Sequence, residues 1–238
     1  MKTLKHSGLA LAATLALTGA MTGAGHAASV SPTFTDEGID TTGTATSTRM
    51  FRADLTGLGL TEIVAVTVRD SGSGFGGSTG IYSGFDLDAI FLDLDGLLTT
   101  TADRIFASSF LFTAGTTRSG SFAPPSPSGG PTNGSSDAST VDEGWATLDS
   151  IDGVFFGTGS LTLGDGGRLT AIFSPEVPVG SSLFLFAGEV SGDPGETLTG
   201  FVDVSDTPPP NVPLPAGLVL LASGLAGAGL LRRRGGRF

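Results

Sequence analysis

The residues of this 238-residue chain that suggest chemistry are carboxylates around one short stretch. The segment "FDLDAIFLDLDG", residues 85–96, places Asp86 and Asp88 two residues apart, and Asp70 precedes it across a glycine-rich loop. Carboxylates and loop carbonyls are the oxygen ligands that Ca²⁺ prefers, in sets of six to eight. We therefore expect Asp70, Asp86 and Asp88 to be candidate Ca²⁺ ligands, although the spacing is not that of an EF-hand.

The same segment has a second interpretation. If residues 85–95 form one strand, Asp86 and Asp88 share one face, and Asp93 and Asp95 share the opposite face. Carboxylates on an exposed strand also oppose edge-to-edge pairing with another chain, and this needs no metal.

The absence of other reactive side chains excludes several enzyme classes. There is no cysteine, and both histidines (His6, His26) and both lysines (Lys2, Lys5) lie within the first 27 residues. The rest of the chain therefore has no Ser–His–Asp or Cys–His nucleophile, no Schiff-base lysine and no zinc site built on His or Cys. Disulfides cannot stabilise it either, so its core or bound ions must do so.

Paired carboxylates leave glycan hydrolysis as the enzymatic alternative. That reaction needs two carboxyl groups about 5 to 10 Å apart across a sugar, and among 23 acidic residues some pair meets this by chance. One Trp and one Tyr offer few rings for stacking on sugars. We therefore expect a non-catalytic protein and keep a carboxylate-based glycan-active enzyme as the alternative.

Short apolar segments separated by Gly, Asp or Pro predict an all-β fold. Helical periodicity is missing, and the segments suit a single β-sandwich or jelly-roll-like domain over residues 28–206. We expect the 16 phenylalanines to fill the space between the sheets. The expected strands are residues 50–55, 62–70, 85–95, 104–113, 153–164, 168–174, 182–190 and 197–205.

One stretch interrupts this pattern. Residues 119–140 are rich in Pro, Gly and Ser and contain almost no apolar side chains, so we expect a disordered loop inside the domain. The alternative is a linker between two half-domains. Trp145, which follows, is expected at the core or its edge.

Charge is distributed unevenly along the chain. All 23 acidic residues lie between Asp36 and Asp206 together with only six arginines, so this part carries a formal charge of −17, against −11 for the whole chain. Such a surface repels nucleic acid and anionic membranes, so we expect no nucleic-acid partner.

The first 27 residues have the three parts of a secretory signal peptide. Lys2 and Lys5 form a basic start, an apolar run follows, and small residues precede an expected cleavage after Ala27. The expected partners are the secretion translocon and signal peptidase.

The C-terminal residues indicate a membrane-directed segment. A Pro-rich spacer, residues 207–215, precedes the uncharged residues 216–231, which as a helix would span about 24 Å. An arginine cluster follows and would remain cytoplasmic by the positive-inside rule. It consists of Arg232, Arg233, Arg234 and Arg237.

The order of motif, apolar helix and arginine cluster over residues 212–238 resembles the VPLPA-CTERM sorting signal, a variant of the PEP-CTERM system. The motif residues are Val212, Pro213, Leu214, Pro215 and Ala216. The resemblance implies recognition by an exosortase-type membrane protease, which would cut near the motif and pass the protein from the inner membrane to the cell surface or the exopolysaccharide. It says nothing about the domain itself.

Together these features predict an exported structural or interaction protein of the cell surface or extracellular matrix. Exopolysaccharide is an expected partner, and Ca²⁺ is the only expected cofactor. A permanently anchored, periplasm-facing membrane protein is the remaining alternative.

Overall fold

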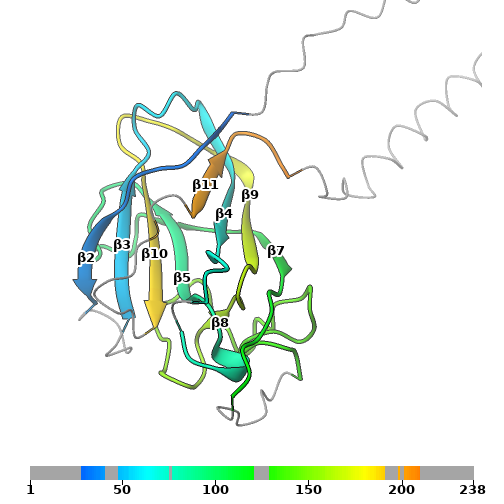
Figure 1. Ribbon diagram of the computed structural model, residues 1–238. Coiled ribbons are helices and arrows are strands. Elements are labelled where there is room, and N and C mark those ends of the chain that lie inside the picture. Colours follow the sequence, from blue (N-terminus) through cyan, green and yellow to red (C-terminus); the bar gives the residue numbers. More distant parts are fainter. Residues whose placement is uncertain are drawn as a thin grey trace, which may run out of the picture.

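The computed structural model describes residues 28–40, 48–74, 77–120, 129–190, 198 and 201–209, and these form two antiparallel β-sheets (Figure 1). Within these ranges there is no α-helix, only the short 3₁₀ turn η1 (Gly80–Tyr82). The prediction of an all-β class is confirmed. The predicted signal peptide (1–27) and apolar helix (216–231) lie outside the described residues.

The first sheet, called here the β4 sheet, has five strands in the order β1-β11-β4-β9-β7. Its long central strands are β-branched or apolar, as in "EIVAVTVR" of β4, which suits a pleated and half-buried surface. The strands are β1 (Ser29–Val30), β4 (Glu62–Arg69), β7 (Ser109–Thr113), β9 (Arg168–Pro178) and β11 (Val202–Ser205).

The second sheet, the β5 sheet, has the order β2-β3-β10-β5-β6, and the short strand β8 also pairs with β5. β10 lies at its centre between β3 and β5. The strands are β2 (Thr35–Ile39), β3 (Thr48–Asp54), β5 (Asp86–Asp93), β6 (Arg104–Phe106), β8 (Leu161–Thr162) and β10 (Phe184–Val190).

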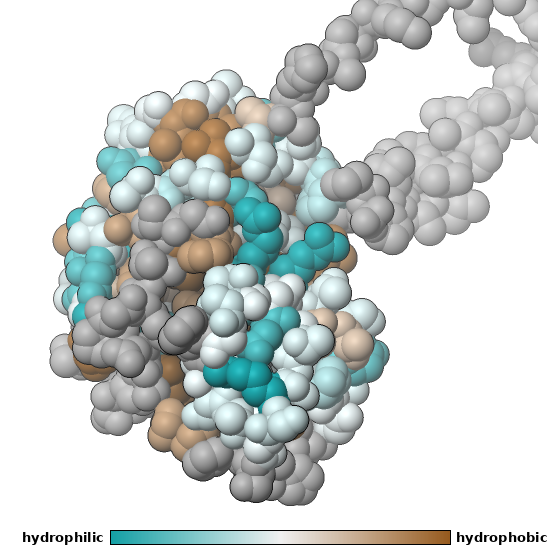
Figure 2. All heavy atoms as spheres, viewed as in Figure 1, coloured by the Kyte–Doolittle hydropathy of each residue, from teal (hydrophilic) through white to brown (hydrophobic). Residues whose placement is uncertain are grey.

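The two sheets enclose one hydrophobic core. Val66 and Leu169 of the β4 sheet belong to the same buried cluster as Ile90 and Leu185 of the β5 sheet. In each strand the residues of this cluster mostly alternate with residues of the opposite face, as the period of a strand requires. Figure 2 shows the exterior of one side, where hydrophobic residues gather over the loops at the top of the picture.

The prediction that phenylalanine fills this core is wrong for most of it. The fully buried residues between the sheets are chiefly Leu, Val, Ala and Ile, with Phe51, Phe112 and Phe173 among them. Phe91 and Phe186 instead stack at 5.3 Å on the outer face of the β5 sheet. On that face the Arg104 guanidinium carbon lies 4.6 Å from the centroid of the Phe91 ring, so the arginine side chain covers the ring.

Two predicted strands also need correction. Residues 104–113 form two strands in different sheets, because the chain turns at Ala107 and Ser108 and crosses from β6 to β7. Ser108 secures the crossing by donating its N–H to Ile172 O at 2.7 Å. Of residues 153–164, only β8 is a strand, and the rest are turns.

Candidate functional site

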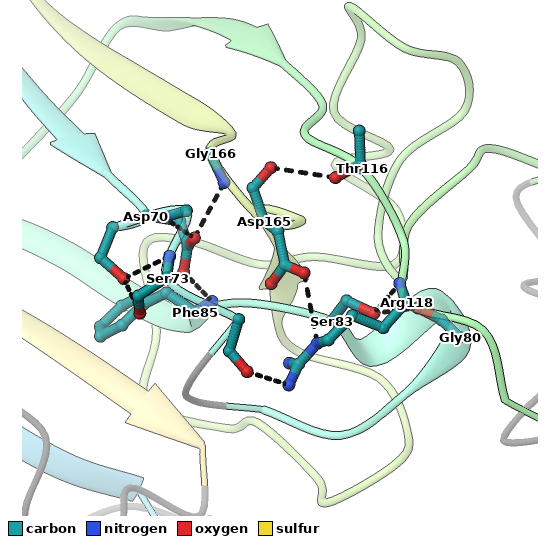
Figure 3. A network of polar contacts seen from close by, with 12 residues as sticks. Asp70, Ser73, Gly80, Ser83, Phe85, Thr116, Arg118, Asp165 and Gly166 are labelled. Carbon is teal, nitrogen blue, oxygen red and sulfur yellow. Dashed lines mark hydrogen bonds and ion pairs between the residues drawn. The ribbon is translucent and has the colours of Figure 1, made fainter.

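Asp70 lies just after β4, and its carboxylate fastens the loops around it (Figure 3). Oδ1 accepts hydrogen bonds from the backbone N–H groups of Gly72 (2.7 Å) and Gly166 (2.9 Å), and Oδ2 accepts one from Phe85 (3.1 Å). An anion surrounded by three N–H donors is stabilised without a metal ion. Asp70 therefore holds its own loop, the start of β5 and the β8–β9 loop together.

Arg118 and Asp165 extend this network on the neighbouring loops (Figure 3). Arg118 Nε lies 3.3 Å from Asp165 Oδ2, and Nη1 donates to Gly74 O at 2.8 Å. The backbone N–H of Arg118 donates to Ser83 Oγ at 2.8 Å. These contacts join three loops at one end of the domain, so they are structural.

Asp86 and Asp88 take different partners. Asp86 accepts a hydrogen bond from the hydroxyl of Thr162, its neighbour across the β5–β8 pairing. Asp88 is fully buried and accepts hydrogen bonds from the Thr48 hydroxyl and from the N–H groups of Asp152 (3.2 Å) and Gly153 (2.8 Å).

Asp88 lies at a β-bulge of β5, and Asp152 and Gly153 lie against its carboxylate. Leu87 pairs with Glu189 and Ala89 with Gly188, which leaves Asp88 as the extra residue of β5. Leu87 and Ile90 both belong to the inter-sheet core, so the alternation shifts by one residue at this point. The expectation that Asp93 faces away from Asp88 is therefore wrong.

Burial raises the pKa of the Asp88 carboxyl to about 6, against an ordinary 3.8, while the hydrogen bonds from Thr48, Gly153 and Asp152 partly offset this. Burial likewise raises the pKa of Asp93, which accepts N–H bonds from Asp95 (3.0 Å) and Gly96 (2.6 Å). Asp88 thus stabilises the bulge in β5, and Asp93 stabilises the turn that follows β5, each by accepting backbone N–H bonds.

The predicted Ca²⁺ site receives no support from this arrangement. Asp70, Asp86 and Asp88 are each engaged by different protein donors, and the structure does not bring the three together. Among the described residues, no group of three or more His, Cys, Asp or Glu side chains is placed to hold a metal ion.

Asn133 is the residue that the sequence analysis missed. It is fully buried, and its side-chain amide donates to Gly157 O (3.1 Å) and Ser160 O (3.1 Å) while accepting the Trp145 indole N–H (2.9 Å). Its backbone N–H donates a hydrogen bond to Ile81 O, and its backbone C=O accepts one from the Thr162 N–H. The prediction of a disordered loop over 119–140 is thus wrong for residues 129–140, while residues 121–128 lie outside the described part.

Residues 129–140 are ordered because buried polar side chains bond one another, not because apolar side chains pack. Thr132 and Ser135 are also fully buried, and their hydroxyls bond each other at 3.1 Å. A segment with almost no hydrophobic side chains is therefore ordered by hydrogen bonds. Trp145 is half-buried with its N–H bonded to Asn133, in accord with the expected place at the edge of the core.

A pocket of about 300 Å³ lies where the chain crosses from β6 to β7. Its apolar side includes Phe106 and Phe110, and its polar side includes Glu143 and Asp149. Both carboxylates are exposed, and no arginine lines the pocket. The further lining residues are Ala107, Ser108, Ala146, Thr147 and Leu148.

The walls of this pocket are held in place by the core. Ala146 and Leu148 belong to the buried cluster between the sheets, and Leu148 O accepts the N–H of Ile90 at 3.0 Å. The Trp145–Asn133 bond fastens the same loop from its other side. This pocket therefore combines rigid walls with two exposed carboxylates, Glu143 and Asp149.

The predicted sorting and processing residues fall outside the described ranges. They are Ala27, the motif Val212, Pro213, Leu214, Pro215 and Ala216, and the cluster Arg232, Arg233, Arg234 and Arg237. Among the residues that are described, no helix has the length and apolar character to cross a membrane.

Comparison with known proteins gives no assignment: no protein-family model matches the chain, and no curated protein or solved structure matches it.

Proposed function

We propose that this chain is an exported, exosortase-sorted component of the cell surface or extracellular matrix, whose β domain acts by structure and interaction rather than by catalysis. The motif residues 212–216, the apolar residues 216–231 and the arginine cluster support the sorting. The basic and apolar parts of residues 1–27 support export.

The observation that carries the non-catalytic role is the way the domain uses its carboxylates. Asp70, Asp88 and Asp93 each accept two or three backbone N–H bonds and thereby fix turns and a bulge. Catalytic acids need a free oxygen that faces substrate. With no His, Cys or Lys after residue 27, few other groups remain for proton or acyl transfer.

We also propose a jelly-roll-like architecture. Without β2, β8 and β9, the sheets read β1-β11-β4-β7 and β3-β10-β5-β6, in which successive strands alternate between the sheets except at the β5–β6 pair. β9 then lies inserted between β4 and β7, and β2 extends the edge beside β3. The space between the two sheets is filled by the buried hydrophobic cluster, so ligands would bind on the edges and loops of the described domain.

The rival function is a glycan-active enzyme, and the pocket beside β6 is the place for it. Glu143 and Asp149 are the two carboxylates there that no described residue engages, and Phe106 offers a ring that is 40% exposed. Two such groups across a sugar are the minimum for hydrolysis.

One experiment separates these functions. The protein is incubated with the producer's own exopolysaccharide, and both sedimentation with the polymer and release of reducing ends are measured. Co-sedimentation without turnover supports the proposal. Turnover that is abolished by Glu143→Gln or Asp149→Asn, with an unchanged melting temperature, would replace it with the enzyme. If the protein neither sediments nor reacts, the exopolysaccharide is not its partner.

A further inference from the structure

The first and last described segments of the domain are fastened together. β1 pairs with β11 through Ser29 with Ser205 and Val30 with Val204. Just before this pairing, Ala28 N lies 3.0 Å from Asp206 Oδ1, and the Asp206 N–H donates to Ala28 O at 3.3 Å. We call Ala28, β1, β11 and Asp206 the terminal clasp.

In the unprocessed chain the nitrogen of Ala28 is a neutral amide, and hydrolysis of the Ala27–Ala28 bond changes its charge. Water adds across the bond, Ala27 keeps the carboxylate, and Ala28 takes an amine that is protonated at neutral pH. The same nitrogen then bears three donors and a positive charge. Asp206 makes no ion pair with an arginine among the described residues, so its carboxylate has no competing cation there.

We propose that removal of the signal peptide after Ala27 creates an ion pair between the Ala28 α-ammonium and the Asp206 carboxylate, which locks the terminal clasp. This inference rests on the export part of the proposed function. The Asp206 carboxylate accepts a hydrogen bond from this nitrogen before and after cleavage, and the ammonium adds the Coulomb attraction between two opposite charges. The domain therefore reaches its full stability only after processing.

The position of the cleavage matters for this pair. Consecutive residues of an extended chain lie about 3.3 Å apart and point to opposite sides, so an ammonium one residue earlier or later would miss Asp206. β1 has only two residues, so the clasp depends on the contacts at its end. Asp206 is followed directly by the Pro-rich spacer, so the same pair also fixes the point from which the C-terminal segment leaves the domain.

The pH dependence of the pair can be worked out from its neighbours. The charged groups beside β1 are Asp203 on β11 and Arg69 on β4, which pair with each other at 2.5 Å, and Asp203 also accepts the Ser31 hydroxyl at 2.5 Å. Asp206 raises the pKa of the amine in the folded state, so the extra stability is complete below about pH 8 and is lost as pH rises through the folded value, by about pH 10.

The test uses the chain from Ala28 to Phe238, in detergent, with its terminus either free or acetylated. Because both lysines lie before Ala28, an amine-reactive acetylating reagent modifies only the α-amino group. We expect the free form to melt about 2–4 °C higher than the acetylated form at pH 6.5 and at the same temperature at pH 10. In Asp206→Asn the free and acetylated forms should melt at the same temperature at pH 6.5 as well. The matched control Asp203→Asn should keep the difference at pH 6.5.

The outcomes distinguish the inference from the function on which it rests. Intact mass of the exported protein from its producer first establishes its N-terminus. If that terminus is not Ala28, the assigned cleavage site is wrong, and the clasp proposal falls with it. If it is Ala28 but acetylation leaves the melting temperature unchanged at pH 6.5, export stands and the ion pair is refuted.

Discussion

Replacement of Asn133 should destabilise the domain more than any other change in the loops. Its amide donates to carbonyls of Gly157 and Ser160 and accepts the indole N–H of Trp145; Asn133 itself is fully buried, and Trp145 is half-buried. Asn133→Ala leaves these partners unsatisfied and opens a small cavity. The loops that carry the pocket and β8 would lose their common attachment.

The expected size follows from three lost hydrogen bonds. Each contributes about 1 kcal/mol net, and buried partners left unpaired add about 1–3 kcal/mol more in total, so the loss is about 4–6 kcal/mol. This is a large share of the stability of an ordinary domain, about 5–15 kcal/mol. In a domain of this size it lowers the melting temperature by roughly 10–20 °C.

Chemical denaturation followed by circular dichroism and by Trp145 fluorescence measures this loss. The matched control is Trp145→Phe, which removes the indole N–H and part of the ring of a half-buried side chain and should cost about 1–2 kcal/mol. This variant is followed by circular dichroism alone. Asn133→Asp should be worse than Ala at neutral pH, because its charge would face two carbonyl oxygens. A cost below about 1 kcal/mol for Asn133→Ala would show that residues 129–140 are not fastened through this side chain.

Three further changes test the roles given to the carboxylates. The pKa of Asp88 in the folded state, about 6, lies above its value in the unfolded chain, so protonation of Asp88 favours the folded state. The wild-type protein should therefore lose stability relative to Asp88→Asn as the pH rises from about 4 to 7. Parallel curves of stability against pH for the two proteins would contradict this. Gly153→Ala should cost about 1–3 kcal/mol because an added Cβ would meet Asp88 and Val190, whereas Gly180→Ala, in open space, should be neutral by the same denaturation assay. Asp70→Ala should lower the free energy of unfolding by about 2–4 kcal/mol, because three N–H groups lose their acceptor. The melting temperature of the wild-type protein should be the same in millimolar Ca²⁺ and in chelator. A rise with Ca²⁺ that Asp70→Ala abolishes would restore the metal site.

The alternation of short apolar segments was enough to predict the all-β class and the central strands. Residues 62–70 and 182–190 became β4 and β10 within two residues, because β-branched and apolar side chains at every second position need one buried face. The split of 104–113 between β6 and β7 was not predictable in this way, since the apolar pattern continues through Ala107 and Ser108 while the chain changes sheets.

The candidate site was harder to predict, because hydrogen bonds rather than periodicity determine it. One bulged residue, Asp88, shifts the faces of β5, and the expected ligands Asp70, Asp86 and Asp88 are each engaged by different donors. Asn133 lies in a stretch whose composition indicates disorder, and its burial depends on partners 12 to 27 residues further along the chain. A single buried Asn among Pro, Gly and Ser is too weak a signal to identify such an attachment point from sequence alone.

The most direct test of the proposed function is the intact mass of the surface-exposed protein purified from its producer. The account predicts a C-terminus within or next to Val212 to Ala216, and truncation before Val212 should release the protein without attachment. Pro213→Ala combined with Pro215→Ala should block this processing and leave the protein in the inner membrane. If all of the surface-exposed protein retains Phe238, the sorting proposal is contradicted, and the C-terminal segment is a permanent anchor.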